Sequence, residues 1–296
     1  MSYNTDLLSA LRLPHVNTMD QSLPSSLPAP CSIITDDALG QYNILLARSG
    51  RRTRMNGDHL GWLGGCEIRP GGTTTIQAQG AAVSTTGTVS TPALASTNLL
   101  TSTRTSLITS AASSNAVAEV HTNDFMAWFG NAAGLGGFYL CMRVAQRAAP
   151  ATSGHFTFAG LASSTAALAL HTTNPRNMVN CIGLGGDGNI ATNDNLFLLN
   201  NDGAGAATTL DTGITLVMGT TSPIVQLELF VIPNTIYVTY RIMNLSDNTF
   251  VPLVGTLTTN LPSSTTFLAL HSNVDTGIDT LAVRAHIARI VLDTDF

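Results

Sequence analysis

Short runs of apolar residues, many alternating with polar ones, dominate the chain from about residue 119 onward. Runs such as FYLCMRV, HFTFAGLA and VQLELFVIP are rich in aromatic and β-branched side chains and span only a few residues each. Such runs are typical of β-strands, whereas an amphipathic helix repeats its apolar residues three and four positions apart over a longer stretch. The pattern therefore predicts an all-β domain in this part of the chain.

Segments with turn chemistry separate these runs. They read GNAAGLGG, NPRN, GDGN, NDGAG, PN, SDN and DTG, and Gly, Asn, Asp and Pro are favoured where the backbone reverses. Pro233 and Asn234 stand between two alternating runs and predict a hairpin. The expected strands lie within residues 125–130, 136–146, 155–163, 177–185, 195–201, 224–233, 235–244, 252–259, 265–272 and 280–293. Strands at such short intervals indicate an antiparallel β-sandwich of jelly-roll or lectin-like type and exclude a βαβ architecture.

The first hundred residues have a different pattern. DLLSALRLP predicts a short helix that ends at Pro14, and SLPSSLPAPC predicts an extended linker. Residues 71–97 are rich in Thr, Ser and Ala and contain few bulky apolar side chains, so alone they could not offset the entropy cost of ordering. We therefore expect a mostly irregular segment over 1–70, a flexible connector or a stalk ordered by neighbouring chains over 71–97, and the sandwich over 98–296.

The composition narrows the function. Charged residues make up only 10% of the chain, all 13 basic residues are Arg, and the net charge is −5. The absence of Lys excludes P-loop and lysine-based chemistry, and the negative charge argues against nucleic-acid binding. Few charges favour an obligate oligomer, with a monomer solvated by Ser, Thr and Asn as the alternative. No signal-peptide pattern and no apolar run of membrane-spanning length is visible, which favours synthesis in a cytoplasm without membrane insertion.

Motifs for catalysis or cofactor binding are missing. The sequence has no G-x-S-x-G elbow and no H-E-x-x-H, and Cys31, Cys66, Cys141 and Cys181 form no close pair, so buried free thiols are expected rather than a zinc site. The histidines fall in or beside expected strands, where packing roles are common. His271 and Asp275 are the nearest approach to a ligand pair, but the residues between them read as a turn. We therefore expect no enzyme, no cofactor and no metal.

Residues 180–205 carry the densest polar chemistry. Gly183, Gly185 and Gly188 match the G-x-G-x-x-G fingerprint, but a dinucleotide site needs a helix directly afterwards, and here the next apolar run predicts a strand. Side-chain oxygens of this segment could converge as a calcium loop, although the register of an EF-hand is absent and Asn and Asp also favour turns. The candidate ligand-binding residues are Asp187, Asn189, Asn193, Asp194, Asn195, Asn201 and Asp202.

Nine segments follow one another between residues 99 and 296: LLTSTRTSLITSAASSNAV, GGFYLCMRVA, FAGLASS, NCIGLGGDG, NLFLLNNDGAGAATTLDTG, LELFVIPN, YVTYRI, GTLTTNLPSSTTFLALH and ARIVLDTDF. In their order and spacing, these segments resemble a C-terminal domain of tailed-bacteriophage tail fibres and related virion proteins. The resemblance implies a non-enzymatic β-sandwich that trimerises on a virion and presents loops to the bacterial surface. Leu198 and Leu199 stand where family members often carry a longer polar side chain, which argues against a shared binding site there.

By analogy, the N-terminal segment would anchor the protein to other virion proteins. The candidate anchoring residues are Arg48, Arg51, Arg52, Arg54 and Trp62. We therefore expect a homotrimeric tail fibre or receptor-binding protein of a virion that attaches to a host glycan or another surface receptor. A capsid fibre or head decoration protein is the alternative, and a glycan depolymerase is disfavoured because the repeats of a β-helix are missing. Aromatic candidates for a sugar-binding platform are Trp128, Phe129, Tyr139 and Phe197.

Overall fold

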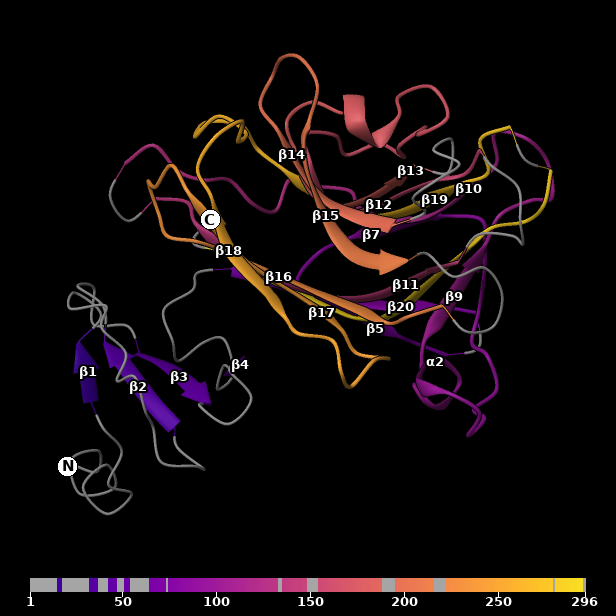
Figure 1. Ribbon diagram of the computed structural model, residues 1–296, viewed down its shortest axis with the longest axis horizontal. Helices are drawn as coiled ribbons and strands as arrows, with labels where there is room; N and C mark the ends of the chain where they lie inside the picture. Colours follow the sequence, from indigo (N-terminus) through magenta and orange to yellow (C-terminus); the bar gives the residue numbers. More distant parts are fainter. Residues whose placement is uncertain are drawn as a thin grey trace. The chain divides into compact units, whose positions relative to one another are not determined.

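The computed structural model describes residues 15–17, 32–36, 42–46, 51–53, 64–72, 74–132, 135–147, 154–187, 195–215, 222–278 and 280–294. The chain divides into two compact units, Met1–Leu63 and Gly64–Phe296 (Figure 1). The described part of the first unit is one sheet of order β1-β2-β3-β4. Its strands are β1 (His15–Asn17), β2 (Ser32–Asp36), β3 (Tyr42–Leu46) and β4 (Arg51–Thr53). The helix expected before Pro14 and the proline-rich linker lie outside the described residues.

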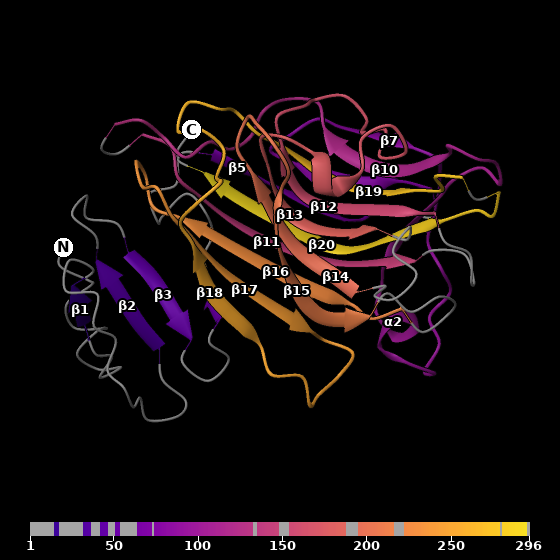
Figure 2. The ribbon, with the colours of Figure 1, turned by 45° about the horizontal axis from the view of Figure 1, so that its top comes forward.

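The second unit is an antiparallel sandwich of two sheets, which confirms the predicted fold class (Figure 2). One sheet has the order β15-β14-β13-β12-β19-β10-β7. The other follows the path β18-β17-β16-β11-β20-β5-β6, with β9 paired to β20 and β8 to β9. We call them the seven-stranded and the nine-stranded sheet.

The strand bounds follow from the alternation of the sequence. They are β5 (Gly64–Pro70), β6 (Ile76–Gln79), β7 (Val83–Thr86), β8 (Thr88–Ser90), β9 (Ser106–Thr109), β10 (Val117–Thr122), β11 (Phe138–Arg147), β12 (Phe156–Ala162), β13 (Cys181–Asp187), β14 (Asn195–Asn201), β15 (Thr208–Thr215), β16 (Val225–Val231), β17 (Val238–Asn244), β18 (Leu253–Leu257), β19 (Ala269–Asp275) and β20 (Arg284–Thr294). Two short helices complete the described part of this unit, α2 (Leu99–Ser102) and the 3-10 turn η3 (Pro175–Asn177). Within the described residues, no helix has the length and apolar character needed to cross a membrane.

The main core lies between the two sheets. In β19, Leu270 and Val274 belong to this core, while the alternate residues His271, Asn273 and Asp275 lie on the outer side of the seven-stranded sheet. The same alternation in β11, β16 and β20 fills the core from the nine-stranded sheet. Burial of these apolar side chains is the main stabilising contribution to the fold.

The boundary predicted at residue 98 is wrong, because the sandwich begins at Gly64. β7 pairs with β10 in the seven-stranded sheet, and β8 pairs with β9 in the other. Only Gly87 separates β7 from β8, and its φ of 103° suits this crossing between the sheets. Backbone pairing orders the Thr-rich segment, and its side chains Ile76 and Val83 pack on the main core. The segment expected to be a connector is therefore ordered by contacts within its own chain.

Most strands expected after residue 130 are present, including the hairpin at Pro233 and Asn234, where β16 pairs with β17 and Asn234 has a φ of 57°. The run at 125–130 forms no strand and makes only an isolated bridge between Ala127 and Leu268. The prediction missed β10 and β15. In β10, Glu119 interrupts the apolar pattern, and β15 is a polar edge strand whose exposed positions hide its alternation.

A long loop covers the outer face of the seven-stranded sheet. This segment, residues 163–180, is called the covering loop, and it carries η3 above the sheet, on the side away from the nine-stranded sheet (Figure 1). Beneath it a second apolar cluster forms from Phe156, Phe158, Ala162, Leu170, Met178, Cys181, Phe197 and Leu199. Both faces of the seven-stranded sheet are therefore buried along its central strands.

Candidate functional site

Buried polar side chains of the seven-stranded sheet hold the covering loop. The carboxylate of Asp275 is fully buried, and its Oδ2 accepts hydrogen bonds from the backbone N–H of His171 at 3.0 Å and from His171 Nδ1 at 2.6 Å. Its Oδ1 accepts from Gly277 N at 2.8 Å. Asn273 Nδ2 donates to Leu168 O at 2.8 Å. A buried carboxylate is tolerated here because three donors point at it.

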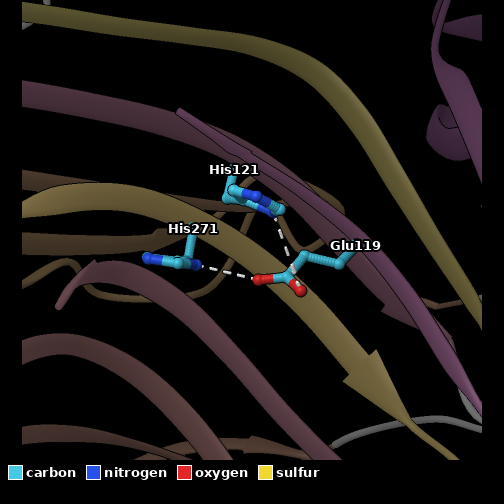
Figure 3. Close-up of side chains that lie close together, drawn as sticks. All are labelled: Glu119, His121 and His271. Carbon is cyan, nitrogen blue, oxygen red and sulfur yellow. Dashed lines mark hydrogen bonds and ion pairs between the residues drawn. The ribbon is translucent and has the colours of Figure 1, made fainter. Parts of the chain in front are cut away.

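A second buried cluster lies beside this one, formed by Glu119 and His121 of β10 and His271 of β19 (Figure 3). Glu119 Oε1 lies 2.8 Å from His271 Nδ1, and Glu119 Oε2 lies 3.9 Å from His121 Nδ1. The two imidazole rings stack with centroids 5.6 Å apart. The cluster also contacts the covering loop, since Leu168 N donates to Glu119 Oε2 at 3.0 Å.

The register of β10 and β19 brings these side chains together. His121 pairs directly with His271, so their rings stand side by side on the outer face. Glu119 lies two residues along β10 from His121 and therefore points to the same face. The histidines were expected to have packing roles, and the sequence did not reveal this cluster because no local spacing links positions so far apart in the chain.

Proton positions in this cluster follow from its partners. His271 Nε2 lies 2.7 Å from the carbonyl oxygen of Ser164, which can only accept, so Nε2 carries a proton. In a neutral ring with its proton on Nε2, the Nδ1 lone pair of His271 would face the Glu119 carboxylate oxygen and repel it. A proton or a metal cation between these two atoms removes the repulsion. Burial lowers the pKa of His121, Glu119 opposes this shift and His271 adds to it. The Nδ1 of His121 is buried without a hydrogen bond, which costs about 1–3 kcal/mol for a polar atom.

The pair suggested by the sequence, His271 and Asp275, is divided in the structure. Both lie on the outer face of β19, but His271 contacts Glu119 while Asp275 contacts His171. The residues between them belong to the strand and not to a turn. His171 could not be found from the sequence as a partner, because it lies in the covering loop and reaches Asp275 only through the fold.

The structure describes four of the predicted ligand-binding residues. Asp187 is buried and accepts from Asn174 Nδ2 at 2.7 Å, and Asn201 donates to Met178 O at 2.6 Å. Because Cys181 at the start of β13 pairs with Asn201, Asp187 lies at the other end of that strand, about 20 Å away.

The other two residues stabilise turns and edges. Asn195 Nδ2 donates to Asp211 Oδ1 at 3.1 Å, and Asp202 Oδ1 accepts from Ala204 N at 2.9 Å. The four described residues thus do not converge on one point. The remaining candidates, Asn189, Asn193 and Asp194, lie outside the described residues, and ligand binding by this segment stays a prediction.

The proposed anchoring residues fall in the first unit. Arg51 and Arg52 lie in β4, whose backbone pairs with β3. Arg48, Arg54 and Trp62 lie outside the described residues. Their role in anchoring stays a prediction.

The glycines of the G-x-G-x-x-G match serve strand packing. Gly183 and Gly185 lie within β13, where they alternate with the core residues Ile182 and Leu184, and β14 follows as the next strand. A Cβ at Gly183 would lie 2.7 Å from the Cα of Gly160 on β12. Gly188 lies outside the described residues. The segment therefore lacks the strand–helix geometry of a phosphate site, as the sequence predicted.

Three cysteines are free thiols within the described residues. Burial raises the pKa of Cys66 and of Cys181 to about 12. Burial, with the nearby Glu228 carboxylate, raises the pKa of Cys141 to about 11. They are spread over three strands, which confirms the interpretation as unlinked thiols, while Cys31 lies outside the described residues. Such thiols are poor nucleophiles at neutral pH.

Three neighbouring aromatic rings, here called the aromatic platform, are the exposed Phe125 and Phe267 and the half-buried Trp128. Trp128 stacks on Phe267 with ring centroids 5.2 Å apart, and Phe125 lies 6.3 Å from Phe267. Phe125 and Phe267 are 40% and 43% exposed. Large apolar side chains that stay this exposed and touch one another form a patch suited to a ligand.

The two segments that carry the platform are fixed to each other. Met126 N donates to Leu268 O at 2.8 Å, and Gly130 N donates to Ser264 O at 3.1 Å. Figures 1 and 2 show the segment before β11 beside the one before β19. The second segment is also held at its other end, because Asn200 Nδ2 donates to the carbonyl oxygen of Asn260 at 2.7 Å. The rings therefore sit on loops ordered by main-chain contacts.

Of the aromatic candidates named from the sequence, only Trp128 belongs to the platform. Phe129 lies in the main core, and Phe197 is buried under the covering loop, where the Arg176 guanidinium lies 4.3 Å from its ring centre. Tyr139 lies in β11 and is partly buried. The platform residues Phe125 and Phe267 were missed because both fall in apolar runs, and a run does not reveal which side chain the fold leaves exposed.

No protein-family model and no curated protein matches the chain. Similar solved structures include lectin II from Ulex europaeus, at 10% identity over 72% of this chain and 93% of that one, with a TM-score of 0.46. A legume lectin-like domain from Entamoeba histolytica matches at 10% identity over 71% and 88%, with a TM-score of 0.43.

A carbohydrate esterase of the Shiga toxin-encoding bacteriophage phi24B is also similar. It matches at 20% identity over 74% of this chain and 91% of that one, with a TM-score of 0.40. At these scores, we draw no functional conclusion from the likenesses.

Proposed function

We propose that this protein is a virion protein of a tailed bacteriophage that recognises a glycan on the host surface, and that the aromatic platform is its binding site. The observation that supports this most strongly is the stack of the half-buried Trp128 on the exposed Phe267, extended by the exposed Phe125. A sugar ring has one face of C–H groups, which packs on an aromatic face, while its hydroxyl groups need polar partners at the edge.

Polar neighbours suit such a ligand. Asn123 and Asp124 are exposed directly before Phe125, and Thr265 is exposed two residues before Phe267. These side chains offer neutral donors and acceptors with one carboxylate, the mixture that hydroxyl groups require. Only 10% of the chain is charged, which fits a neutral ligand better than a phosphate-rich one.

The role on a phage particle rests on the sequence resemblance to tail-fibre domains. The segments that carry it form β9, β11 to β20 and the loops between them, in one continuous sandwich. In this proposal the sandwich is the receptor-binding part of a homotrimeric tail fibre, and the first unit attaches it to the particle. The protein binds its glycan without chemical change, and it needs no cofactor for this.

The test uses the purified full chain. We expect it to bind host cells and to compete with phage adsorption, and Trp128→Ala to weaken cell binding at least about tenfold, as loss of a central aromatic contact does. Ile278→Ala is the matched control: Ile278 is 76% exposed and lies beyond the opposite end of β19, so binding should not change. Circular dichroism verifies that both variants fold.

Two results would overturn parts of the proposal. If folded Trp128→Ala binds cells as the unaltered chain does, the platform is not the site. If the unaltered chain neither binds host cells nor competes with adsorption, receptor recognition fails altogether. Labelled protein located on the head of the virion, away from the tail tip, would favour the role of a head decoration protein.

A further inference from the structure

We propose that Glu119, His121 and His271 form a site for one divalent transition-metal cation of the zinc class, buried beneath the covering loop. The site is separate from the aromatic platform and does not depend on glycan binding. It joins β10, β19 and the covering loop, as Figure 3 shows for the three side chains.

The spacing of the donor atoms suits a metal ion. One donor atom from each residue can be chosen so that all three lie within 4.8 Å of one another. In a tetrahedral zinc site, bonds of about 2.0–2.1 Å place any two donor atoms about 3.3 Å apart. The observed separations, 2.8 Å from Glu119 to His271 and 3.9 Å from Glu119 to His121, lie on either side of that value. The two distances involve different carboxylate oxygens, Oε1 towards His271 and Oε2 towards His121, so each histidine nitrogen faces one oxygen of Glu119.

The hydrogen bonds leave the correct nitrogen of His271 for coordination. Its Nε2 donates to Ser164 O at 2.7 Å, so in the neutral ring the lone pair is on Nδ1, which faces Glu119. Metal-binding histidines commonly donate their other N–H to a backbone carbonyl in this way, which fixes the ring and its tautomer. Without a cation between them, the Nδ1 lone pair and the carboxylate would repel each other.

His121 supplies the independent observation. It is only 6% exposed, and its Nδ1 has no hydrogen-bond partner although it faces Glu119 across 3.9 Å. A proton shared by His271 and Glu119 would satisfy that pair and leave this nitrogen unused. A metal ion at the centre would satisfy all three residues at once.

The donor set decides the class of metal. Two imidazole nitrogens and one carboxylate suit Zn²⁺, Co²⁺ and Ni²⁺, whereas Ca²⁺ and Mg²⁺ require mostly oxygen ligands. Glu119 and His271 also bind the main chain of the covering loop, at Leu168 and Ser164. The cation would therefore fasten this loop to the sheet, and its role would be structural.

The experiment measures metal content and coordination in the full chain. The protein is produced with added Zn²⁺, dialysed without chelator and analysed by mass spectrometry of the metal, and a second sample is refolded with Co²⁺. We expect about one zinc per chain and, with Co²⁺, the intense visible absorption of a tetrahedral site. The zinc-loaded protein should also unfold at a higher temperature than the metal-free protein.

His121→Phe is the decisive variant, because it keeps a flat ring stacked on His271 and removes the nitrogen. We expect its affinity for Zn²⁺ to fall at least about tenfold and the Co²⁺ spectrum to be lost. Removing only a hydrogen-bond partner of a metal ligand already lowers metal affinity by about tenfold or more, so removing a ligand should cost at least as much. His171→Asn is the control. It removes an imidazole that belongs to the covering loop but keeps a donor for Asp275, and metal binding should be unchanged.

The proposal is overturned by any of three outcomes. The first is a folded protein without bound zinc after both preparations, which would leave a protonated His271–Glu119 pair as the full description. The second is metal binding that His121→Phe leaves unaltered. The third is a Co²⁺ spectrum that disappears in His171→Asn instead. If His121→Phe does not fold, Glu119→Gln replaces it, because the amide keeps the shape of the side chain and removes the negative charge.

Discussion

Two sets of carboxylates, one on the outer face of each sheet, differ in their exposure to water. On the nine-stranded sheet, Glu67 pairs with Arg289 at 3.0 Å, with 27% and 56% of the side chains exposed. On the seven-stranded sheet, Glu119 and Asp275 are fully buried beneath the covering loop, each beside a histidine. Water can solvate Glu67 and Arg289, whereas the buried carboxylates of Glu119 and Asp275 depend on hydrogen-bond partners from the protein.

This difference shows where chemistry can arise in the sandwich. An open face tolerates many arrangements of charge, because each one costs little. A covered face restricts each carboxylate to one set of donors, and an unmatched buried atom such as His121 Nδ1 is then costly. The candidate metal centre lies on the covered face for this reason.

The largest effect is expected for Asp275→Ala. The change would leave three donors from His171 and Gly277 without their acceptor, and losing one partner of a buried charged pair costs about 3–5 kcal/mol. Glu67→Ala on the open face should cost about 0–1 kcal/mol. Urea denaturation of both variants measures the contrast. Equal losses of stability would show that the two faces do not differ in this way.

A smaller loss is expected for Gly183→Ala, which tests how closely β12 and β13 approach beneath the covering loop. A Cβ there would lie 2.5 Å from Ala159 O and 2.7 Å from Gly160 Cα, both backbone atoms, and overpacking of this kind costs about 1–3 kcal/mol. Gly72→Ala is the control, since its Cβ would meet only the Thr75 hydroxyl at 3.5 Å. Thermal unfolding would contradict the prediction if the two variants melted together.

The smallest effect concerns two thiols, one on each outer face. Cys181 lies under the covering loop with a pKa of about 12, and Cys141 lies on the nine-stranded sheet with a pKa of about 11. In a Cys31→Ser background, iodoacetamide should modify Cys141 faster than Cys181, as peptide mass spectrometry can show. The reverse order would place the more accessible thiol under the loop.

The same thiols predict how stability depends on pH. Their folded pKa values lie above the ordinary value of 9.0, so the unfolded chain releases these protons first as the pH rises. Stability from this source is complete below about pH 9 and is lost as the pH rises towards 11 to 12. Denaturation midpoints between pH 8 and pH 11 would check the direction.

The local pattern predicted the strands in which apolar and polar residues alternate strongly. It failed for strands whose polar side chains are buried by a distant part of the chain. FYLCMRV became β11 and VQLELFV became β16, because a strand with one face in the core must alternate. Glu119 and His121 concealed β10, since a sequence does not show that the covering loop will bury them. FMAWFG looked like a strand, yet it became the irregular segment that exposes Phe125 and leaves Trp128 half-buried.

The sequence by itself determined the fold class and the positions along the chain of most strands from β11 to β20. It also indicated that the cysteines are free thiols and that the glycine fingerprint is not a phosphate site. These follow from neighbours along the chain, where alternation and turn chemistry act over a few residues. Only the tertiary structure decided that residues 76–90 belong to the sheets, that Trp128 stacks on Phe267, and that Glu119 meets two histidines. Those contacts join distant parts of the chain, and strand pairing and burial establish them only when the sandwich closes.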